Sequence, residues 1–193
     1  MRLFIAFTVP QNVITCVNQA QEQVKQVLRA DRWQPTKNLH ITLHFLGEID
    51  EGLLPEIIRD MEMVCSIIKP FTLSLGRFGV FPEKGNPRVL WIGLKGNQEV
   101  MQQLHLLLGK RLERHQEIMI DKRSYHPHIT LARGPETKEQ ASLPLADWSH
   151  RFLPEYHPSW KVEEIILFRS ELLPTGAVHT PLHTSKLGDT TNL

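Results

Sequence analysis

The stretch Asn38-Leu39-His40-Ile41-Thr42-Leu43 recurs almost unchanged later in the chain, as His126-Pro127-His128-Ile129-Thr130-Leu131. Both copies contain the tetrapeptide His-Ile-Thr-Leu among residues that favour β-strands. Successive side chains of a strand point to opposite faces, so in each copy the His and the Thr share one face while the Ile and the Leu share the other. The repeat therefore predicts two equivalent strands, and it favours duplication of one structural unit.

Two such strands facing each other across a cleft would present two imidazoles and two hydroxyls. Hydrolysis of a phosphodiester needs a base for the attacking water and an acid for the leaving alkoxide, on opposite sides of phosphorus. Histidine can serve as either, because its unperturbed pKa is about 6.5. Threonine hydroxyls can donate hydrogen bonds to the non-bridging oxygens, where negative charge gathers in the transition state. One copy alone would be interpreted as a half-buried strand, whereas the repetition favours paired-histidine chemistry on a phosphodiester.

The order of apolar patterns predicts the fold class. Helical spacing of apolar residues covers about 13–28, 53–67 and 97–114. Strands are expected at 2–9, at the two His-Ile-Thr-Leu copies, and at 71–78, 88–94, 162–169 and 178–182, with a long polar loop from Gly134 to about Trp160. This order lacks regular βαβ spacing and predicts a bilobal α+β fold. Two mostly antiparallel sheets, related by pseudo-twofold duplication, would surround a central cleft, with helices on the outer faces. Residues 1–187 would form one two-lobed domain, and residues 188–193 a flexible C-terminal tail.

Composition limits the partners and the location. The 193 residues are 41% hydrophobic and 22% charged, which is enough for a sizeable core. The net charge of +1 lacks the strong basic character of proteins that grip long nucleic acid, so any contact with RNA should be short. No apolar run suits a membrane span and no signal peptide is evident, so a cytoplasmic protein is expected. Cys16 and Cys65 have no spacing typical of a zinc site or a structural disulfide. No cofactor and no obligate protein partner are expected, and the protein should be a monomer.

Four segments together resemble a known family: RLFIAFTVP at 2–10, NLHITLHFLGE at 38–48, RVLWIGL at 88–94 and YHPHITLAR at 125–133. In this order and spacing the chain resembles the two-histidine phosphoesterase superfamily. Within it, the chain is similar to the RNA 2′,3′-cyclic phosphodiesterases, also called 2′-5′ RNA ligase-like proteins, over roughly residues 1–187. The resemblance implies hydrolysis, without a metal, of a nucleoside or RNA-terminal 2′,3′-cyclic phosphate to a 2′-phosphomonoester.

The resemblance also implies a role for each motif residue: proton donor at His40, proton acceptor at His128, and phosphate contacts at Thr42 and Thr130. It further implies a substrate-binding role for Arg133, whose guanidinium could bind phosphate or stack on a base. Phe4 and Ala6 share a face of the first expected strand, and this face could lie in the cleft. Phe4 is therefore a candidate for stacking on the nucleobase. A core phenylalanine is the alternative interpretation for Phe4.

Three other interpretations stay open. Four imidazoles could bind zinc if both strands continued regularly, from His40, His44, His126 and His128. That site would contain no carboxylate, which metal sites for phosphoesters usually include, and it would not explain the two threonines; no metal is therefore expected. The same cleft could instead act as a 2′-5′ RNA ligase, or bind RNA ends or nucleotides without turnover. Further histidines, such as His105 and His179, are expected to be surface groups.

Overall fold

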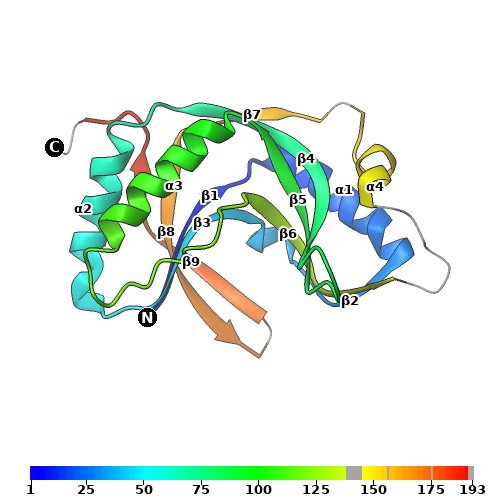
Figure 1. The fold of residues 1–193 in the computed structure, drawn as a ribbon, viewed down its shortest axis with the longest axis horizontal. Coiled ribbons are helices and arrows are strands. Elements are labelled where there is room, and N and C mark those ends of the chain that lie inside the picture. The colour runs from blue at the N-terminus through cyan, green and yellow to red at the C-terminus, as the bar shows by residue number, and fades with distance from the viewer. Residues whose placement is uncertain (138–144, 156, 175, 191–193) are drawn as a thin grey trace.

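The computed structural model describes residues 1–137, 145–155, 157–174 and 176–190. Its helices are α1 (Gln11–Val27), α2 (Leu54–Cys65), α3 (Gln98–Leu112) and α4 (Leu145–Phe152), with 3₁₀ turns at Thr36–Asn38 and Glu51–Leu53. Its strands are β1 (Arg2–Thr8), β2 (Leu28–Trp33), β3 (His40–Glu48), β4 (Phe71–Phe81), β5 (Val89–Gly96), β6 (His128–Thr137), β7 (Ser159–Val162), β8 (Glu164–Leu173) and β9 (Gly176–Lys186) (Figure 1).

Within these ranges, nine strands form one curled sheet whose strand pairs are antiparallel. The order is β7-β4-β5-β6-β3-β1-β8-β9, and β2 pairs with β6. The two motif strands, β3 and β6, are neighbours and pair through Ile41 and Ile129. We call β3, β1, β8 and β9 the β3 half, and β6, β2, β5, β4 and β7 the β6 half. The predicted α+β fold class is confirmed, and the two predicted sheets are these two halves of one sheet.

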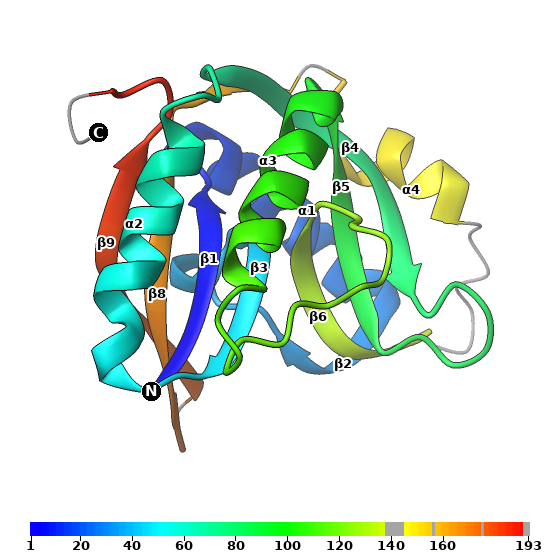
Figure 2. The same cartoon turned by 60° about the vertical axis from the view of Figure 1, so that its left-hand side comes forward.

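The helices cover the two halves in pairs. Helices α2 and α3 pack together on the β3 half, and α1 and α4 pack together on the β6 half (Figure 2). Two of these helices cross between the halves: α1 follows β1 of the β3 half, and α3 follows β5 of the β6 half. We call α1 and α3 the crossing helices. Each half is therefore covered in part by a helix that follows a strand of the other half.

The apolar undersides of both motif strands are buried, as the alternation predicts. Ile41 and Ile129 are buried, and so are the leucines that follow each threonine. The crossing helix α1 buries a regularly spaced apolar face, formed by Val13, Val17, Ala20 and Val24. The core therefore lies between the sheet and its helices, and it leaves the His and Thr face of each motif strand free for a site.

Some elements differ from the sequence-based expectation. The region expected as a polar loop from Gly134 to Trp160 contains the end of β6, helix α4 and the start of strand β7, while 138–144 and 156 lie outside the described residues. Helix α4 has only eight residues, too few for a repeating apolar pattern. Strand β2 carries three charged residues and is recognised only through its backbone pairing with β6.

The C-terminal end can be described only in part. The backbone N–H of Gly188 donates to the carbonyl of Cys65, and the expected tail continues into 191–193, which lie outside the described residues. None of the helices in the described ranges has the length and apolar character that crossing a membrane requires.

Candidate active site

The two motif imidazoles have the same local geometry. His40 Nδ1 lies 2.7 Å from the carbonyl oxygen of Asn38, and His128 Nδ1 lies 2.6 Å from that of His126. A carbonyl oxygen only accepts, so each Nδ1 carries the hydrogen and each Nε2 is left for proton transfer. Thr42 lies on the same face of β3 as His40, and Thr130 lies on the same face of β6 as His128. The structure therefore brings together, on neighbouring strands, the four residues that the repeat predicts.

Each motif strand contains a β-bulge at the leucine of His-Ile-Thr-Leu. The pairs on either side of the bulge are Thr42–Ala6 and His44–Ile5 in β3, and Thr130–Trp91 and Ala132–Leu90 in β6. The extra residue resets the alternation of the strand. As a result, the side chain three positions after the threonine returns to the face of the His and the Thr. That residue is Phe45 in β3 and Arg133 in β6, and both are exposed.

The bulge explains the placement of Arg133. In a regular strand it would point away from Thr130, because the two residues are three positions apart. Its guanidinium makes no ion pair or hydrogen bond with another residue of the described ranges. Its positive charge nevertheless contributes to lowering the pKa of both motif histidines, so it lies close enough to act on both. Arg133 thus places a positive charge beside the two imidazoles.

The protonation of the two imidazoles is set mainly by burial. Burial lowers the pKa of His40 from 6.5 to about 4, and the neighbouring positive charges act in the same direction. Burial also lowers the pKa of His128, against the effect of its hydrogen bond to the carbonyl of His126. Both imidazoles are therefore neutral at pH 7 in the unliganded protein. An anion placed between them would favour the charged form of either one.

His44 corrects one sequence-based expectation. A regular strand would place it on the face of His40, but the bulge at Leu43 turns it to the opposite, helix-covered face, where it is 4% exposed. Its ring stacks on His105 of α3 at 4.1 Å between centroids, and its Nε2 donates to the carbonyl of His105 at 2.8 Å. The four-histidine site is therefore not assembled. The described residues also contain no group of three or more His, Cys, Asp or Glu side chains suited to hold a metal ion.

Phe4 lies on the cleft face of β1, outside the buried hydrophobic cluster that takes in its neighbours Leu3 and Ile5, and its base-stacking role stays a prediction. It is 4% exposed, its ring stacks on Phe168 at 5.1 Å, and it lies 5.0 Å from the His40 ring. The ring thereby supports the His40 imidazole. In the β6 half, Phe81 lies 5.2 Å from the His128 ring. Each motif histidine therefore packs against a phenylalanine of its own half.

Sequence reasoning missed three residues next to the motifs. His179 was expected at the surface, but its ring lies 5.4 Å from that of His40. Tyr125 donates its hydroxyl to the carbonyl of Thr42 at 3.0 Å, and His105 donates its Nδ1–H to that of Leu43 at 2.9 Å. The position of Tyr125 directly before the second motif was a usable signal. The placement of His105 and His179 depends on packing of distant elements, for which the local sequence contains no signal.

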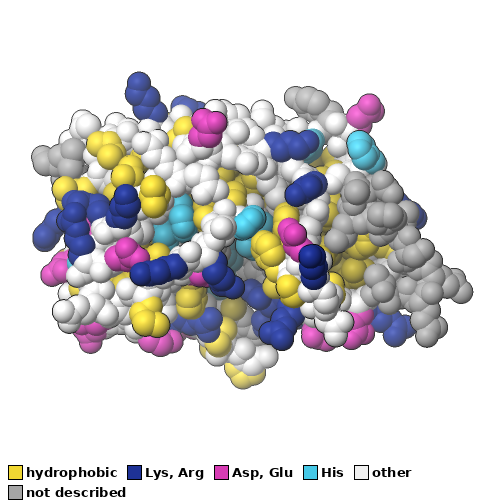
Figure 3. All heavy atoms as spheres, viewed as in Figure 1, with side chains coloured by type: hydrophobic (Ala, Val, Ile, Leu, Met, Phe, Trp, Pro, Cys, Tyr) yellow, Lys and Arg dark blue, Asp and Glu magenta, His cyan; other side chains and the backbone are white. Residues whose placement is uncertain are grey.

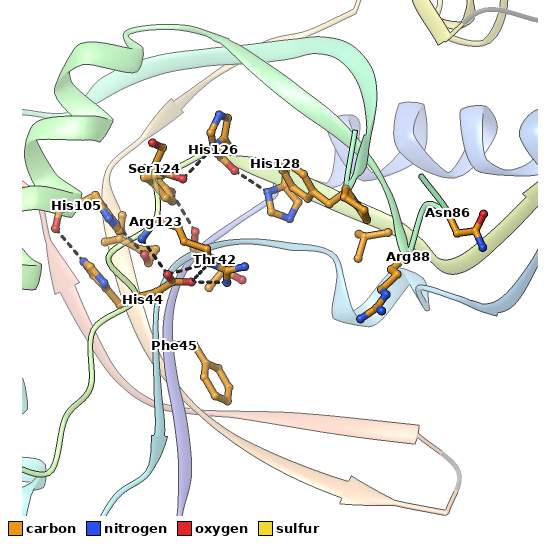
Figure 4. A pocket seen from close by; sticks show the side chains of 16 residues that line it. Thr42, His44, Phe45, Asn86, Arg88, His105, Arg123, Ser124, His126 and His128 are labelled. Carbon is orange, nitrogen blue, oxygen red and sulfur yellow. Dashed lines mark hydrogen bonds and ion pairs between the residues drawn. The ribbon is translucent and has the colours of Figure 1, made fainter. Parts of the chain in front are cut away.

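A cavity of about 970 Å³ opens beside His128 and Thr42. Figure 3 shows histidine side chains gathered in the hollow of this face, with Lys and Arg side chains around it. In Figure 4, Thr42 and His128 lie between His105 at one end and the loop after β4 at the other, which carries Asn86 and Arg88. The guanidinium of Arg88 has no hydrogen-bond or ion-pair partner in the described ranges. The cavity thus combines one of the two proton-transfer groups, His128, with a cation and exposed aromatic surface, while His40, Thr130 and Arg133 lie outside its lining.

A duplicated fold with one His-Ile-Thr-Leu strand in each half defines a class of two-histidine proteins. Residues 7–172 match the model of the family described as the 2′-5′ RNA ligase superfamily. The chain therefore belongs to this superfamily, which confirms the resemblance found in its motifs.

Individual relatives agree with this assignment. The chain is 30% identical over 186 residues to the RNA 2′,3′-cyclic phosphodiesterase of Methanocaldococcus jannaschii, covering 93% of this chain and 96% of the relative. Among solved structures, TT0787 of Thermus thermophilus matches with a TM-score of 0.77 and 30% identity, covering 98% of this chain and 100% of that one. Escherichia coli LigT complexed with 3′-AMP matches with a TM-score of 0.73 and 26% identity, covering 97% and 98%.

Proposed function

We propose that this protein is an RNA 2′,3′-cyclic phosphodiesterase, which hydrolyses a nucleoside or RNA-terminal 2′,3′-cyclic phosphate to a 2′-phosphomonoester without a metal. The observation that carries the proposal is the matched geometry of His40 and His128. Both imidazoles are tied through Nδ1 to a backbone carbonyl two residues earlier, and both keep Nε2 for proton transfer. The names of relatives over nearly the whole chain support the substrate class.

The reaction assigns opposite proton states to the two histidines. By similarity to the family, His128 takes a proton from the attacking water, and His40 gives one to the leaving ribose O3′. The P–O bond to O3′ breaks as the bond from water to phosphorus forms, and the phosphate stays on O2′. The cyclic phosphate supplies the negative charge that the unliganded site lacks, which favours the imidazolium form of His40.

The remaining polar groups bind the phosphate and orient the substrate. The hydroxyls of Thr42 and Thr130 donate to the non-bridging oxygens, where charge develops. Arg133 binds the phosphate or the nucleobase, and its counterpart in the other half is Phe45. This difference on the cleft face breaks the symmetry of the two motifs, so the substrate binds in one orientation.

The expected partner is an RNA end or a nucleotide that carries a 2′,3′-cyclic phosphate. One chain supplies both motifs, so a monomer suffices for the reaction. We place the activity in the cytoplasm, a compartment that keeps thiols reduced. The free thiols of Cys16 and Cys65 agree with this location.

A second candidate is 2′-5′ RNA ligation at the same site, with a ribose hydroxyl in place of water. The cavity of about 970 Å³ beside His128 has room for more than one water, which a ribose hydroxyl acting as nucleophile would need. A nucleoside would fit on the side from which the nucleophile attacks.

Product analysis tests the proposal. The protein is incubated with 2′,3′-cyclic AMP, with and without EDTA, and 2′-AMP is separated from 3′-AMP by chromatography. We expect 2′-AMP, at the same rate in both samples. Predominant 3′-AMP would contradict the orientation, and an EDTA-sensitive rate restored by zinc or manganese would contradict the metal-free mechanism. No hydrolysis of any cyclic phosphate would favour a binding protein without turnover.

A further inference from the structure

We infer that Gln21 and His105 are positioning residues that hold the bulges of the two motif strands. Each side chain caps the carbonyl of the bulged leucine, and thereby fixes which later side chain faces the cleft. The inference rests on the proposed function, because Arg133, which the bulge of β6 turns to the cleft, is assigned there to bind the phosphate or the nucleobase.

Gln21 holds the bulge of β6. It lies on the crossing helix α1, is 5% exposed, and donates from Nε2 to the carbonyls of Leu131 and Gln34, each at 3.0 Å. The carbonyl of Leu131 also accepts the backbone N–H of Gln34 at 2.8 Å. The buried side-chain amide of Gln21 thus donates to two backbone segments that meet at the bulge, the one that follows β2 and β6 itself. Gln21 thereby ties α1, the turn after β2 and the bulge of β6 together.

His105 holds the bulge of β3 in the same way. It lies on the other crossing helix, α3, and its Nδ1 donates to the carbonyl of Leu43 at 2.9 Å. Its ring is stacked between those of His44, at 4.1 Å, and Tyr125, at 4.0 Å. The hydroxyl of Tyr125 donates to the carbonyl of Thr42 at 3.0 Å, so two neighbouring carbonyls at this bulge are satisfied by side chains.

The correspondence between the two halves points to a role beyond packing. A bulge interrupts the regular hydrogen bonds of the ladder, so its carbonyls take donors from elsewhere. The carbonyl of Leu131 accepts from the backbone N–H of Gln34 and from Gln21, and that of Leu43 accepts from His105. In both halves a side-chain donor comes from a crossing helix, and its acceptor is the carbonyl of the motif leucine.

The bulge of β6 turns Arg133 to the cleft face, and the bulge of β3 turns Phe45 to the same face. If a bulge relaxed to a regular strand, these side chains would move to the opposite face.

The test removes each donor while keeping the side-chain volume. Gln21→Met and His105→Leu delete the hydrogen bond to the bulge. His105→Asn is the rescue variant, because the amide nitrogen of Asn lies about where the imidazole Nδ1 lies. Val24→Ala is the matched control: it truncates a buried side chain one turn further along α1, away from the bulge. Each variant is measured for melting temperature, for kcat/KM on 2′,3′-cyclic AMP, and for hydrogen–deuterium exchange.

We expect Gln21→Met and His105→Leu to lower kcat/KM by about 10-fold to 100-fold, the cost of a small misplacement of catalytic groups. Val24→Ala should lower the melting temperature and leave kcat/KM within about twofold. His105→Asn should recover most of the activity. In an Arg133→Ala background, Gln21→Met should have a smaller effect than alone, because it acts partly through that residue. Exchange should rise at 128–134 in Gln21→Met, and at 40–46 in His105→Leu.

Two results would overturn the inference. One is that Gln21→Met and His105→Leu behave as the control does, with lower stability and unchanged kcat/KM. The other is unchanged exchange in the motif strands, which needs no substrate and decides the question even for a protein without turnover. Failure of the proposed function is a distinct result, since the wild-type protein would then hydrolyse no cyclic phosphate.

Discussion

At pH 7 both motif imidazoles of the unliganded protein are neutral, whereas the proposed reaction needs His40 as an imidazolium. Burial lowers the pKa of His40 to about 4, and Arg133 contributes in the same direction. The substrate supplies what is missing, because a cyclic phosphate carries a negative charge that favours protonation of the nearby imidazole. The charge of the substrate is therefore part of the catalytic machinery, and the free and bound proteins should titrate differently.

The pH dependence of the rate follows from these shifts. The profile of kcat/KM reports the free enzyme, and it should be bell-shaped with its maximum below pH 6.5, because the pKa values of both histidines are lowered. The profile of kcat reports the complex, so its alkaline limb should lie at higher pH. Initial rates from about pH 4 to pH 9 give both profiles. An alkaline limb of kcat/KM above about pH 8 would contradict the assigned protonation states.

At the level of the strands, the repeated tetrapeptide predicts His40, Thr42, His128 and Thr130, because alternation holds within four residues of a strand. It fails at the next residue, where the bulge begins. A regular strand would place His44 in the cleft, which is the condition that the four-histidine interpretation needs, but His44 lies in the core beneath α3. A bulge depends on the register of β3 with β1 and of β6 with β5, and the sequence of one strand contains no signal for register. Arg133 was accessible only through resemblance to the family.

The buried position of His44 has a consequence for stability. Its pKa falls from 6.5 to about 4 in the folded protein, mainly through burial. A lowered folded-state pKa stabilises the fold above pH 6.5, and this contribution is lost as the pH falls toward 4. The unfolding free energy of the wild type should therefore fall as the pH is lowered through this window. In His44→Leu it should fall less steeply, by up to about 1 kcal/mol per pH unit. Urea unfolding at pH 7, 6 and 5 measures it, and equal slopes for variant and wild type would contradict the assignment.

At the level of the whole molecule, the order of strands and helices was enough to predict an α+β fold with two halves. It was not enough to predict that α1 and α3 each cover the half opposite to the strand they follow, since helical periodicity does not reveal which sheet a helix covers. The short elements β2, α4 and β7 were missed for a related reason, because pairing and packing with distant elements define them more than local pattern does. The crossing helices join the halves, so the site at their junction depends on the complete fold.

The central claim is that His40 and His128 act as one acid–base unit on a 2′,3′-cyclic phosphate. The most direct measurement is kcat on 2′,3′-cyclic AMP for His40→Ala, His128→Ala and the double variant, each with its melting temperature. We expect each single variant to lose at least about 100-fold in kcat while staying folded, and the double variant to be little slower than the poorer single one, because groups that act as a unit are non-additive. Turnover near that of the wild type in either single variant, or losses that simply multiply in the double variant, would contradict the paired-histidine mechanism.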